Sequence, residues 1–121
     1  MKKGFKKKFT FFPDTYILPS ELHELKSQLN KYRNKWYIIK PQASCQGRGI
    51  FLTKTYDQID PNEKYVAQKY ITKPLLIDGL KFDLRIYVLL AGTDPLKVFV
   101  YEDGLVRLCC ERYKPPTKCN I

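Results

Sequence analysis

A polar loop that carries two glycines has the composition of a phosphate-binding segment. It contains Gln46, Gly47, Arg48 and Gly49, and Lys40 precedes it. Exposed backbone N–H groups, a guanidinium and an ammonium are all donors to phosphate oxygens. No Gly-Lys-Ser/Thr sequence follows, so the loop is not a Walker loop. The residues predict a clamp over nucleotide phosphates, and an ordinary glycine hairpin loop with solvated basic side chains is the alternative.

Charged side chains also alternate along the segment from Lys81 to Leu90. Strand periodicity places Lys81, Asp83 and Arg85 on one face and apolar residues on the other, which we expect to be core. Cation, carboxylate and cation on an apolar background predict a polar site, with a solvated outer face as the alternative. Arg107 has apolar neighbours on a later strand and either reaches the surface or faces a site.

Apolar and β-branched runs predict the strands that would hold these groups. We expect strands over residues 36–40, 50–52, 64–71, 81–90, 96–101 and 105–110. Pro41 should end the first of them because it has no N–H group. The end of segment 64–71 could present backbone groups to a nucleobase, and a plain sheet strand is the alternative. Glu102-Asp103-Gly104 predicts a hairpin turn between the last two strands.

One helix is predicted near the N-terminus of the chain. Leu22, Leu25 and Leu29 recur at helical spacing and form one apolar stripe. Ser20 precedes the stripe and is a suitable N-cap, because its hydroxyl can accept from a free backbone N–H group. The helix should end near Arg33-Asn34.

The bulk composition indicates a single globular domain with a basic surface. The chain has 121 residues, 44% hydrophobic and 14% aromatic, with a net charge of +10. This charge favours an acidic partner, such as nucleic acid, an acidic protein surface or a polyphosphate. The chain has four cysteines, none in a Cys-x-x-Cys pair, and one histidine. This pattern argues against a zinc site and favours reduced thiols. No apolar run is long enough for a membrane helix.

Residues 1–8 contain five lysines and should form a flexible basic arm. Residues 9–121 should then form one domain, because no linker divides them.

A series of short segments between Phe12 and Arg112 follows one order. The segments are Phe12-Pro13, Leu18-Pro19-Ser20-Glu21, Ile39-Lys40-Pro41, Gln46-Gly47-Arg48-Gly49-Ile50, Tyr70-Ile71, Pro74-Leu75-Leu76-Ile77-Asp78-Gly79, Lys81-Phe82-Asp83-Leu84-Arg85-Ile86-Tyr87-Val88, Asp94-Pro95-Leu96 and Glu102-Asp103-Gly104-Leu105. Together they resemble the tubulin–tyrosine ligase-like family, and most closely its polyglutamylase branch. A single segment would be weak evidence, but the whole series in order is specific.

That resemblance implies an α+β chain that forms part of an ATP-grasp fold, its central portion and part of its C-terminal portion. It implies an ATP-dependent ligase that adds glutamate to glutamate side chains on tubulin tails. The acceptor carboxylate would become an acylphosphate, which the amine of L-glutamate then attacks. The expected partners are tubulin tails and L-glutamate, with no nucleic acid and no membrane. The expected location is the cytoplasm, on the microtubule cytoskeleton, including the cilium or basal body.

The resemblance also implies roles for individual residues. The expected ATP contacts are Lys40, Gln46, Gly47, Arg48, Gln68, Lys69, Tyr70, Ile71, Lys81, Phe82 and Asp83. Arg107 would hold the carboxylate of the incoming glutamate, a task that suits a guanidinium fork. Arg85 would stabilise charge on the transferred phosphoryl group or the acceptor. Gln46 would also meet the acceptor, and glutamine there is associated in the family with chain elongation, whereas arginine goes with starting the branch.

The chain departs from the family pattern in one respect. ATP and Mg²⁺ are the expected cofactors, but the family's Mg²⁺ carboxylates and an Asn lie after the point where this chain stops. We therefore expect no metal ligand here, and a truncated piece that is inactive alone. A non-catalytic basic remnant that binds acidic tubulin tails is the alternative. A glycylase is a further alternative within the enzyme class, and a nucleic-acid binder ranks last because no stacking motif is visible.

Overall fold

The computed structural model describes residues 10–43 and 48–117. The chain divides into two compact units, which are described separately below. Unit 1 comprises residues 1–72 with 116–121, and unit 2 comprises residues 73–115. The predicted basic arm at residues 1–8 lies outside the described residues.

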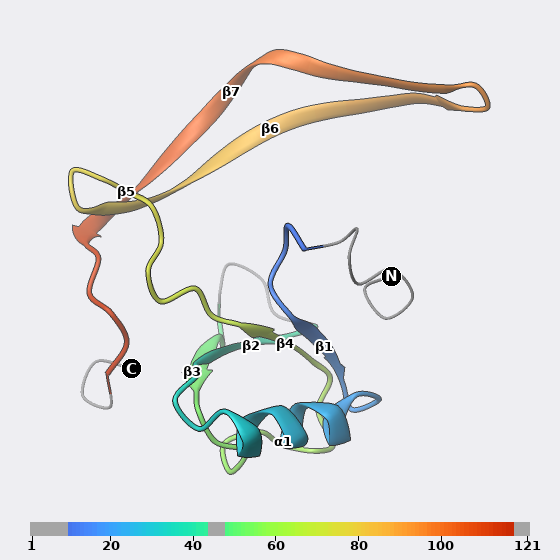
Figure 1. Cartoon of the computed structure of the whole chain (residues 1–121). Helices are drawn as coiled ribbons and strands as arrows, with labels where there is room; N and C mark the ends of the chain where they lie inside the picture. The colour runs from blue at the N-terminus through green and yellow to red at the C-terminus, as the bar shows by residue number, and fades with distance from the viewer. Residues whose placement is uncertain (1–9, 44–47, 118–121) are drawn as a thin grey trace. The chain divides into compact units, whose positions relative to one another are not determined.

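Unit 1 is a four-stranded antiparallel sheet with one helix (Figure 1). Its elements are β1 (Thr15–Leu18), α1 (Leu22–Lys31), β2 (Tyr37–Pro41), β3 (Phe51–Thr53) and β4 (Tyr65–Lys69). The strand order is β1-β4-β2-β3, so the last strand lies between the first two. The strands predicted at 36–40, 50–52 and 64–71 are confirmed, each with ends within two residues of the prediction.

The apolar stripe of α1 is confirmed, but its predicted cap is wrong. Leu25 and Leu29 are buried, whereas the Ser20 hydroxyl donates to the carbonyl oxygen of Ile17 at 2.9 Å. The N-cap residue is Glu21, whose carboxylate accepts from the backbone N–H of Ile17 at 2.8 Å and makes no side-chain cap bond. A carboxylate at this end still complements the positive end of the helix dipole.

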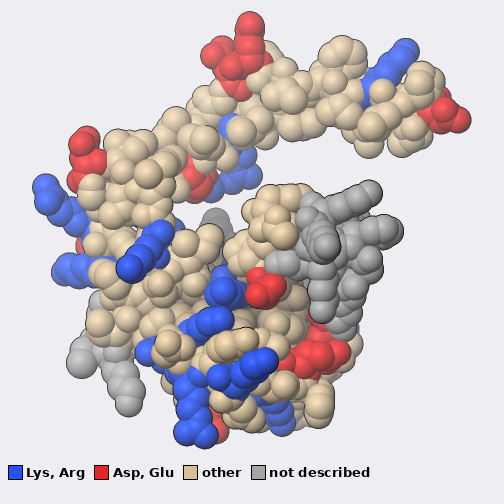
Figure 2. Space-filling model, in the orientation of Figure 1, with Lys and Arg blue, Asp and Glu red and all other residues tan. Residues whose placement is uncertain are grey.

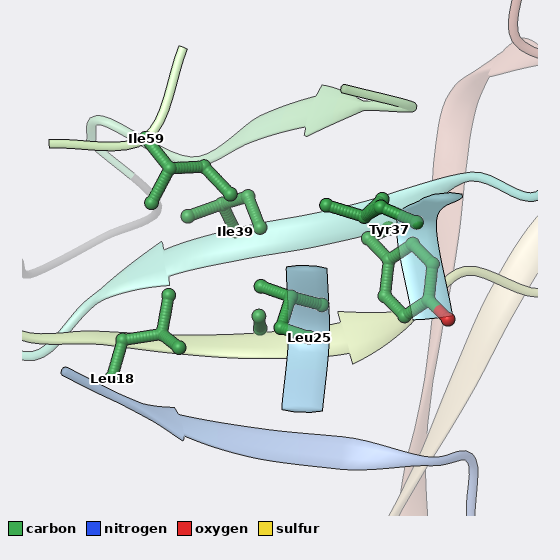
Figure 3. Packing of buried hydrophobic residues seen from close by; sticks show 7 residues of the cluster. Leu18, Leu25, Tyr37, Ile39 and Ile59 are labelled. Carbon is green, nitrogen blue, oxygen red and sulfur yellow. The ribbon is translucent and has the colours of Figure 1, made fainter. Parts of the chain in front are cut away.

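The core of unit 1 lies between α1 and the sheet. Figure 3 shows Leu25 of α1 among side chains of β1 and β2. The buried cluster is Leu18, Leu25, Leu29, Tyr37, Ile39, Ile59 and Ala67. Leu25 and Ile39 are 0% exposed, and burial of side chains of this size stabilises a fold by about 1.5–3 kcal/mol each. This core fixes β2 and β4, which carry the predicted site residues Lys40, Gln68 and Lys69.

Because Tyr37 is buried in this core, the stability of unit 1 should depend on pH in the alkaline range. Burial, with smaller contributions from Tyr16, Asp14 and Tyr32, raises the pKa of Tyr37 to about 12. An unfolded tyrosine has a pKa of about 10, so the folded chain holds this proton more tightly. The stabilisation is complete below pH of about 10 and should disappear as the pH rises towards 12, a loss of about 2–3 kcal/mol.

Tyr37→Phe keeps the buried ring and should remove this part of the pH dependence. The check is the free energy of unfolding in urea across the alkaline range, with Tyr101→Phe as the control, since Tyr101 is 60% exposed. Equal alkaline destabilisation of the wild type and Tyr37→Phe would contradict the assignment.

Unit 2 is an antiparallel sheet of three strands in the order β5-β6-β7. They are β5 (Leu76–Ile77), β6 (Leu80–Thr93) and β7 (Leu96–Arg112). The two long strands form the extended hairpin in Figure 1. The predicted strand at 81–90 is confirmed and extends further at its C-terminal end.

The predicted hairpin turn at Glu102-Asp103-Gly104 is wrong. These residues lie inside β7, and the turn is Asp94-Pro95, between the paired residues Thr93 and Leu96. Ile86 pairs with Gly104 and Val88 with Val100, so one residue of β6 lies opposite three of β7. Such an irregularity bends and twists a strand, and glycine is common there. The Asp-Gly signal therefore marks a bulge.

The space around residue 104 at this bulge is too small for any side chain, so glycine is required there. A Cβ atom at position 104 would lie 2.7 Å from the backbone carbonyl oxygen of Arg85. Gly104→Ala should force the two strands apart and destabilise the hairpin by about 1–3 kcal/mol. Hydrogen exchange of the β6 and β7 amides should become faster in this variant but not in Gly92→Ala, where the nearest backbone atom would be 3.3 Å away. Unchanged exchange in Gly104→Ala would contradict the packing argument.

The prediction that one face of β6 is core is not met in this structure. Leu84, Ile86 and Val88 are 58–59% exposed. Leu75, expected to be buried in the connection before β5, is 79% exposed. The buried cluster of the described residues comes from unit 1.

Candidate functional site

The predicted site residues fall in both units, and each part is described by itself. In unit 1 they are Lys40, Arg48, Gln68, Lys69, Tyr70 and Ile71, and in unit 2 they are Lys81, Phe82, Asp83, Arg85 and Arg107. Gln46 and Gly47 lie outside the described residues, so their predicted roles remain predictions.

Unit 1 joins Lys40 and Gln68 through a hydrogen-bonded chain. The Lys40 ammonium donates to Oε1 of Gln68 at 3.1 Å. The amide of Gln68 donates to Oγ1 of Thr15 at 2.9 Å, and the Thr15 hydroxyl donates to the carbonyl oxygen of Pro13 at 3.0 Å. The Lys40 ammonium can only donate, and the Thr15 hydroxyl donates its single hydrogen to Pro13. The Gln68 side chain must therefore point its oxygen at Lys40 and its nitrogen at Thr15, which fixes the orientation of its amide. Gln68 therefore positions the Lys40 ammonium, and both of its polar atoms are engaged.

Thr15 is a supporting residue that the sequence reasoning missed. It lies on β1 opposite Gln68 of β4 in the register, while β2 places Lys40 beside the same strand. A threonine in an aromatic segment carries no functional signal in a sequence. The contact depends on a pairing between strands that lie about 50 residues apart.

The end of β4 is where backbone groups were expected to face a nucleobase. The N–H group of Lys69 donates to the Asp14 carbonyl, and that of Tyr70 donates to the Trp36 carbonyl, both at 2.8 Å. These two backbone donors are engaged within unit 1. Ile71 follows directly and is 56% exposed, which leaves its side chain accessible to a ligand.

The glycine loop returns to the sheet beside β2. Arg48 is exposed, and Gly49 has a φ of +70°, a conformation that side chains disfavour. A Cβ atom at position 49 would lie 3.2 Å from Cγ of Pro41. Glycine at position 49 therefore allows the backbone there to pass close to the end of the strand that carries Lys40.

Unit 2 pairs two residues to which different roles were assigned. Asp83 of β6 and Arg107 of β7 face each other in the register. Nε and Nη2 of Arg107 donate to the two carboxylate oxygens of Asp83, each at 2.9 Å. The hydrogen bond from Arg107 is the main cause that lowers the pKa of Asp83, and the same bond raises the pKa of Arg107. Both side chains are more than half exposed, so the pair adds little stability and mainly orients the guanidinium.

Arg85 belongs to the same polar surface of unit 2. It lies two residues after Asp83, which puts both on one face of β6, and its charge also lowers the pKa of Asp83. Lys81 and Phe82 begin the strand and are half-buried. The structure thus groups Asp83, Arg85 and Arg107 as one charged cluster.

The described residues contain no group of three or more His, Cys, Asp or Glu side chains that could hold a metal ion. Cys109 and Cys110 are free and exposed. Among the described residues, no helix is long and apolar enough to cross a membrane. The ammonium group of Lys40 and the guanidinium groups of Arg48, Arg85 and Arg107 can each bind an anion.

This arrangement of strands belongs to the ATP-grasp class of enzymes. The crystal structure of the C-terminal domain of Kluyveromyces lactis Pby1, an ATP-grasp enzyme that interacts with the mRNA decapping enzyme Dcp2, superposes with a TM-score of 0.58. The two sequences are 27% identical, and the match covers 90% of this chain and 35% of the Pby1 domain. The fold is thus part of an ATP-grasp fold, as predicted.

The family is shown by the sequence comparisons. The model of the tubulin-tyrosine ligase family matches residues 1–120. A probable beta-tubulin polyglutamylase of Tetrahymena thermophila is 51% identical over 123 residues, and human tubulin polyglutamylase TTLL6 is 48% identical over 121 residues. The chain belongs to the tubulin-tyrosine ligase family. Both matches cover all of this chain, but it spans only 10% and 14% of these relatives.

Proposed function

We propose that this chain supplies ATP-contacting and glutamate-contacting side chains of a tubulin polyglutamylase, an ATP-dependent ligase that adds glutamate to glutamate side chains on tubulin tails. The observation that carries the proposal is similarity over the full chain to relatives named as tubulin polyglutamylases, including mouse TTLL13 at 44% identity. The site geometry supports it, because each unit presents oriented cations to an anionic ligand.

Lys40 is the phosphate contact in unit 1. Gln68 and Thr15 hold its ammonium in one place, so little side-chain freedom is lost when it meets an anion. Arg48 and Gln46 extend this contact from the loop, and Lys69, Tyr70 and Ile71 lie against the base. In unit 2, Lys81, Phe82 and Asp83 are the residues that we assign to ATP. ATP, when bound, supplies the phosphoryl group that activates an acceptor carboxylate.

Arg107 binds the carboxylate of the incoming glutamate, and Asp83 keeps its guanidinium oriented before the substrate arrives. Arg85, on the same face, stabilises negative charge on the phosphoryl group or the acceptor. Bond formation then joins the glutamate amine to the acceptor carbonyl and releases phosphate. Mg²⁺ is assigned to none of the described residues, among which no carboxylate cluster is found.

The location and product follow from the substrate. A ligase that modifies tubulin works in the cytoplasm on the microtubule cytoskeleton, including the cilium or basal body. Gln46 favours elongation of an existing glutamate chain. A non-catalytic role, in which the basic chain binds acidic tubulin tails, is the second candidate, and the net charge of +10 supports it.

A segment exchange separates the two candidates. The matching 121 residues of human TTLL6 are replaced by this chain, and ATP-dependent incorporation of labelled glutamate, glycine or tyrosine into microtubules is measured. Glutamate alone should be incorporated. A folded graft that binds microtubules without adding any amino acid would favour the non-catalytic role, and incorporation of glycine would indicate a glycylase.

A further inference from the structure

Four lysines of unit 1 place their ammonium groups over aromatic rings. Lys26 lies 3.8 Å from the ring centroid of Tyr56, and Lys54 lies 4.5 Å from that of Trp36. Lys35 and Lys31 both lie over Tyr32, at 3.6 Å and 5.4 Å. We call these four lysines and three rings the lysine–aromatic surface. It is built from α1, the turn after α1 and the loop after β3, and Figure 2 shows Lys and Arg gathered where α1 runs in Figure 1.

The backbone that carries this surface is fixed. The N–H group of Lys35 donates to the Tyr32 carbonyl at 3.0 Å. Thr53 and Thr55 flank Lys54. The buried Thr53 hydroxyl donates to the Thr55 carbonyl oxygen and accepts from the Thr55 backbone N–H. The loop that carries Tyr56 is anchored by Ile59, which is 3% exposed and bonded to the Tyr56 carbonyl. Ordered cations lose less conformational entropy on binding than free lysines do.

These charges are not neutralised within the described chain. Across residues 10–43 and 48–117, no ion pair joins a carboxylate to any of the four ammonium groups. An ammonium over a ring gains some energy from the ring quadrupole but keeps its full charge. The surface therefore attracts an anion, and four cations together fit an extended polyanion better than a single small ion.

The accessibility of the three rings indicates whether the surface suits a peptide or a nucleic acid. Proteins that bind single-stranded nucleic acid stack bases on exposed aromatic faces. Here lysines cover faces of Tyr32 and Tyr56, and Trp36 is only 6% exposed. The surface offers charge without a stacking platform, which favours a chain of carboxylates.

We propose that the lysine–aromatic surface is a binding site for glutamate-rich acidic peptides, separate from the residues assigned to ATP and glutamate. The choice of glutamate rests on the proposed function, whereas the attraction for a polyanion rests on the surface itself. A ligase that lengthens glutamate chains produces such a peptide. The lysine–aromatic surface binds part of that peptide, while the end of the peptide that reacts is not bound by this surface.

The test measures binding of a fluorescent oligoglutamate peptide to the whole chain by anisotropy, without ATP or free glutamate. The variant Lys26→Gln/Lys35→Gln/Lys54→Gln should bind about tenfold more weakly, because each solvent-screened ion pair with the peptide contributes a small factor to the affinity. The matched control Lys73→Gln/Lys97→Gln/Lys114→Gln removes the same charge from exposed lysines of unit 2 and should bind nearly as well as the wild type.

Arginine at the three surface positions should retain binding, which separates loss of charge from loss of folding. Equal weakening in the surface and control variants would overturn the proposal, because binding would then reflect net charge alone. Tighter binding of single-stranded DNA than of the peptide, with the same sensitivity, would overturn it in favour of a nucleic-acid surface. Ligase activity is absent from this measurement, so failure of the proposed function would not mimic either result.

Discussion

Arg107→Lys should lower glutamate addition by the TTLL6 graft about a hundredfold, the scale of losing an oriented donor in a catalytic site. Lysine keeps the positive charge but cannot make the two parallel bonds that guanidinium makes with a carboxylate. Asp83 accepts from Nε and Nη2 of Arg107, which leaves the Nη1 group and the second Nη2 hydrogen to donate to the carboxylate of a free amino acid.

The readout that identifies this role is the KM for glutamate, which should rise far more than the KM for ATP. Arg112→Lys is the matched control, since Arg112 is an exposed arginine at the end of the same strand. A merely structural Arg107 would change both KM values together. An unchanged KM for glutamate in a folded, active variant would refute the assignment.

Lys81→Ala should reduce the ATP-dependent rate of the same graft by about a hundredfold or more, because the phosphate charge of ATP would lose one of its proposed cationic contacts. Lys81 is half-buried at the start of β6, where it pairs with Leu76 of β5. The loss should appear in the KM for ATP, with glutamate affinity retained.

Lys97→Ala serves as the comparison, because Lys97 is exposed on β7 and has no assigned contact. If both lysine variants lose the same activity, Lys81 has no special role in nucleotide binding.

Three of the four strands of unit 1 could be predicted because aromatic and β-branched residues mark them locally, whereas β1 was not predicted as a strand. β2 is a buried aromatic and β-branched run, and Pro41 ends it. The stripe of Leu25 and Leu29 was equally clear. The cap was missed because Ser20 and Glu21 are both polar residues with acceptor oxygens, and the backbone around Ile17 decided between them.

The hairpin of unit 2 was misplaced because two turn signals compete in it. Asp103-Gly104 is the stronger signal in a sequence, but Asp94-Pro95 also favours a turn, and it is where β6 and β7 are joined. The choice depends on cross-strand pairing over the length of both strands. Glycine at 104 serves the close approach to Arg85.

The candidate site was predicted as a set of residues, but its contacts were not. Lys40 and Gln68 were assigned separately, and only the β2–β4 register brings them together. Asp83 and Arg107 were given different ligands, and the register beyond the bulge makes them partners. Neither register can be derived from local residue types, because each depends on strands distant in sequence.

The most direct test of the central claim is a residue-resolved NMR titration of the whole chain with ATP and Mg²⁺. We expect weak binding, with shifts confined to Lys40, Gln46 to Arg48, Gln68 to Ile71 and Lys81 to Asp83, and with the α1 lysines unaffected. An oligoglutamate peptide should instead shift Lys26, Lys35 and Lys54. ATP shifts on the α1 lysines alone, or none in a folded chain at high ATP, would contradict the claim that this chain carries the nucleotide contacts.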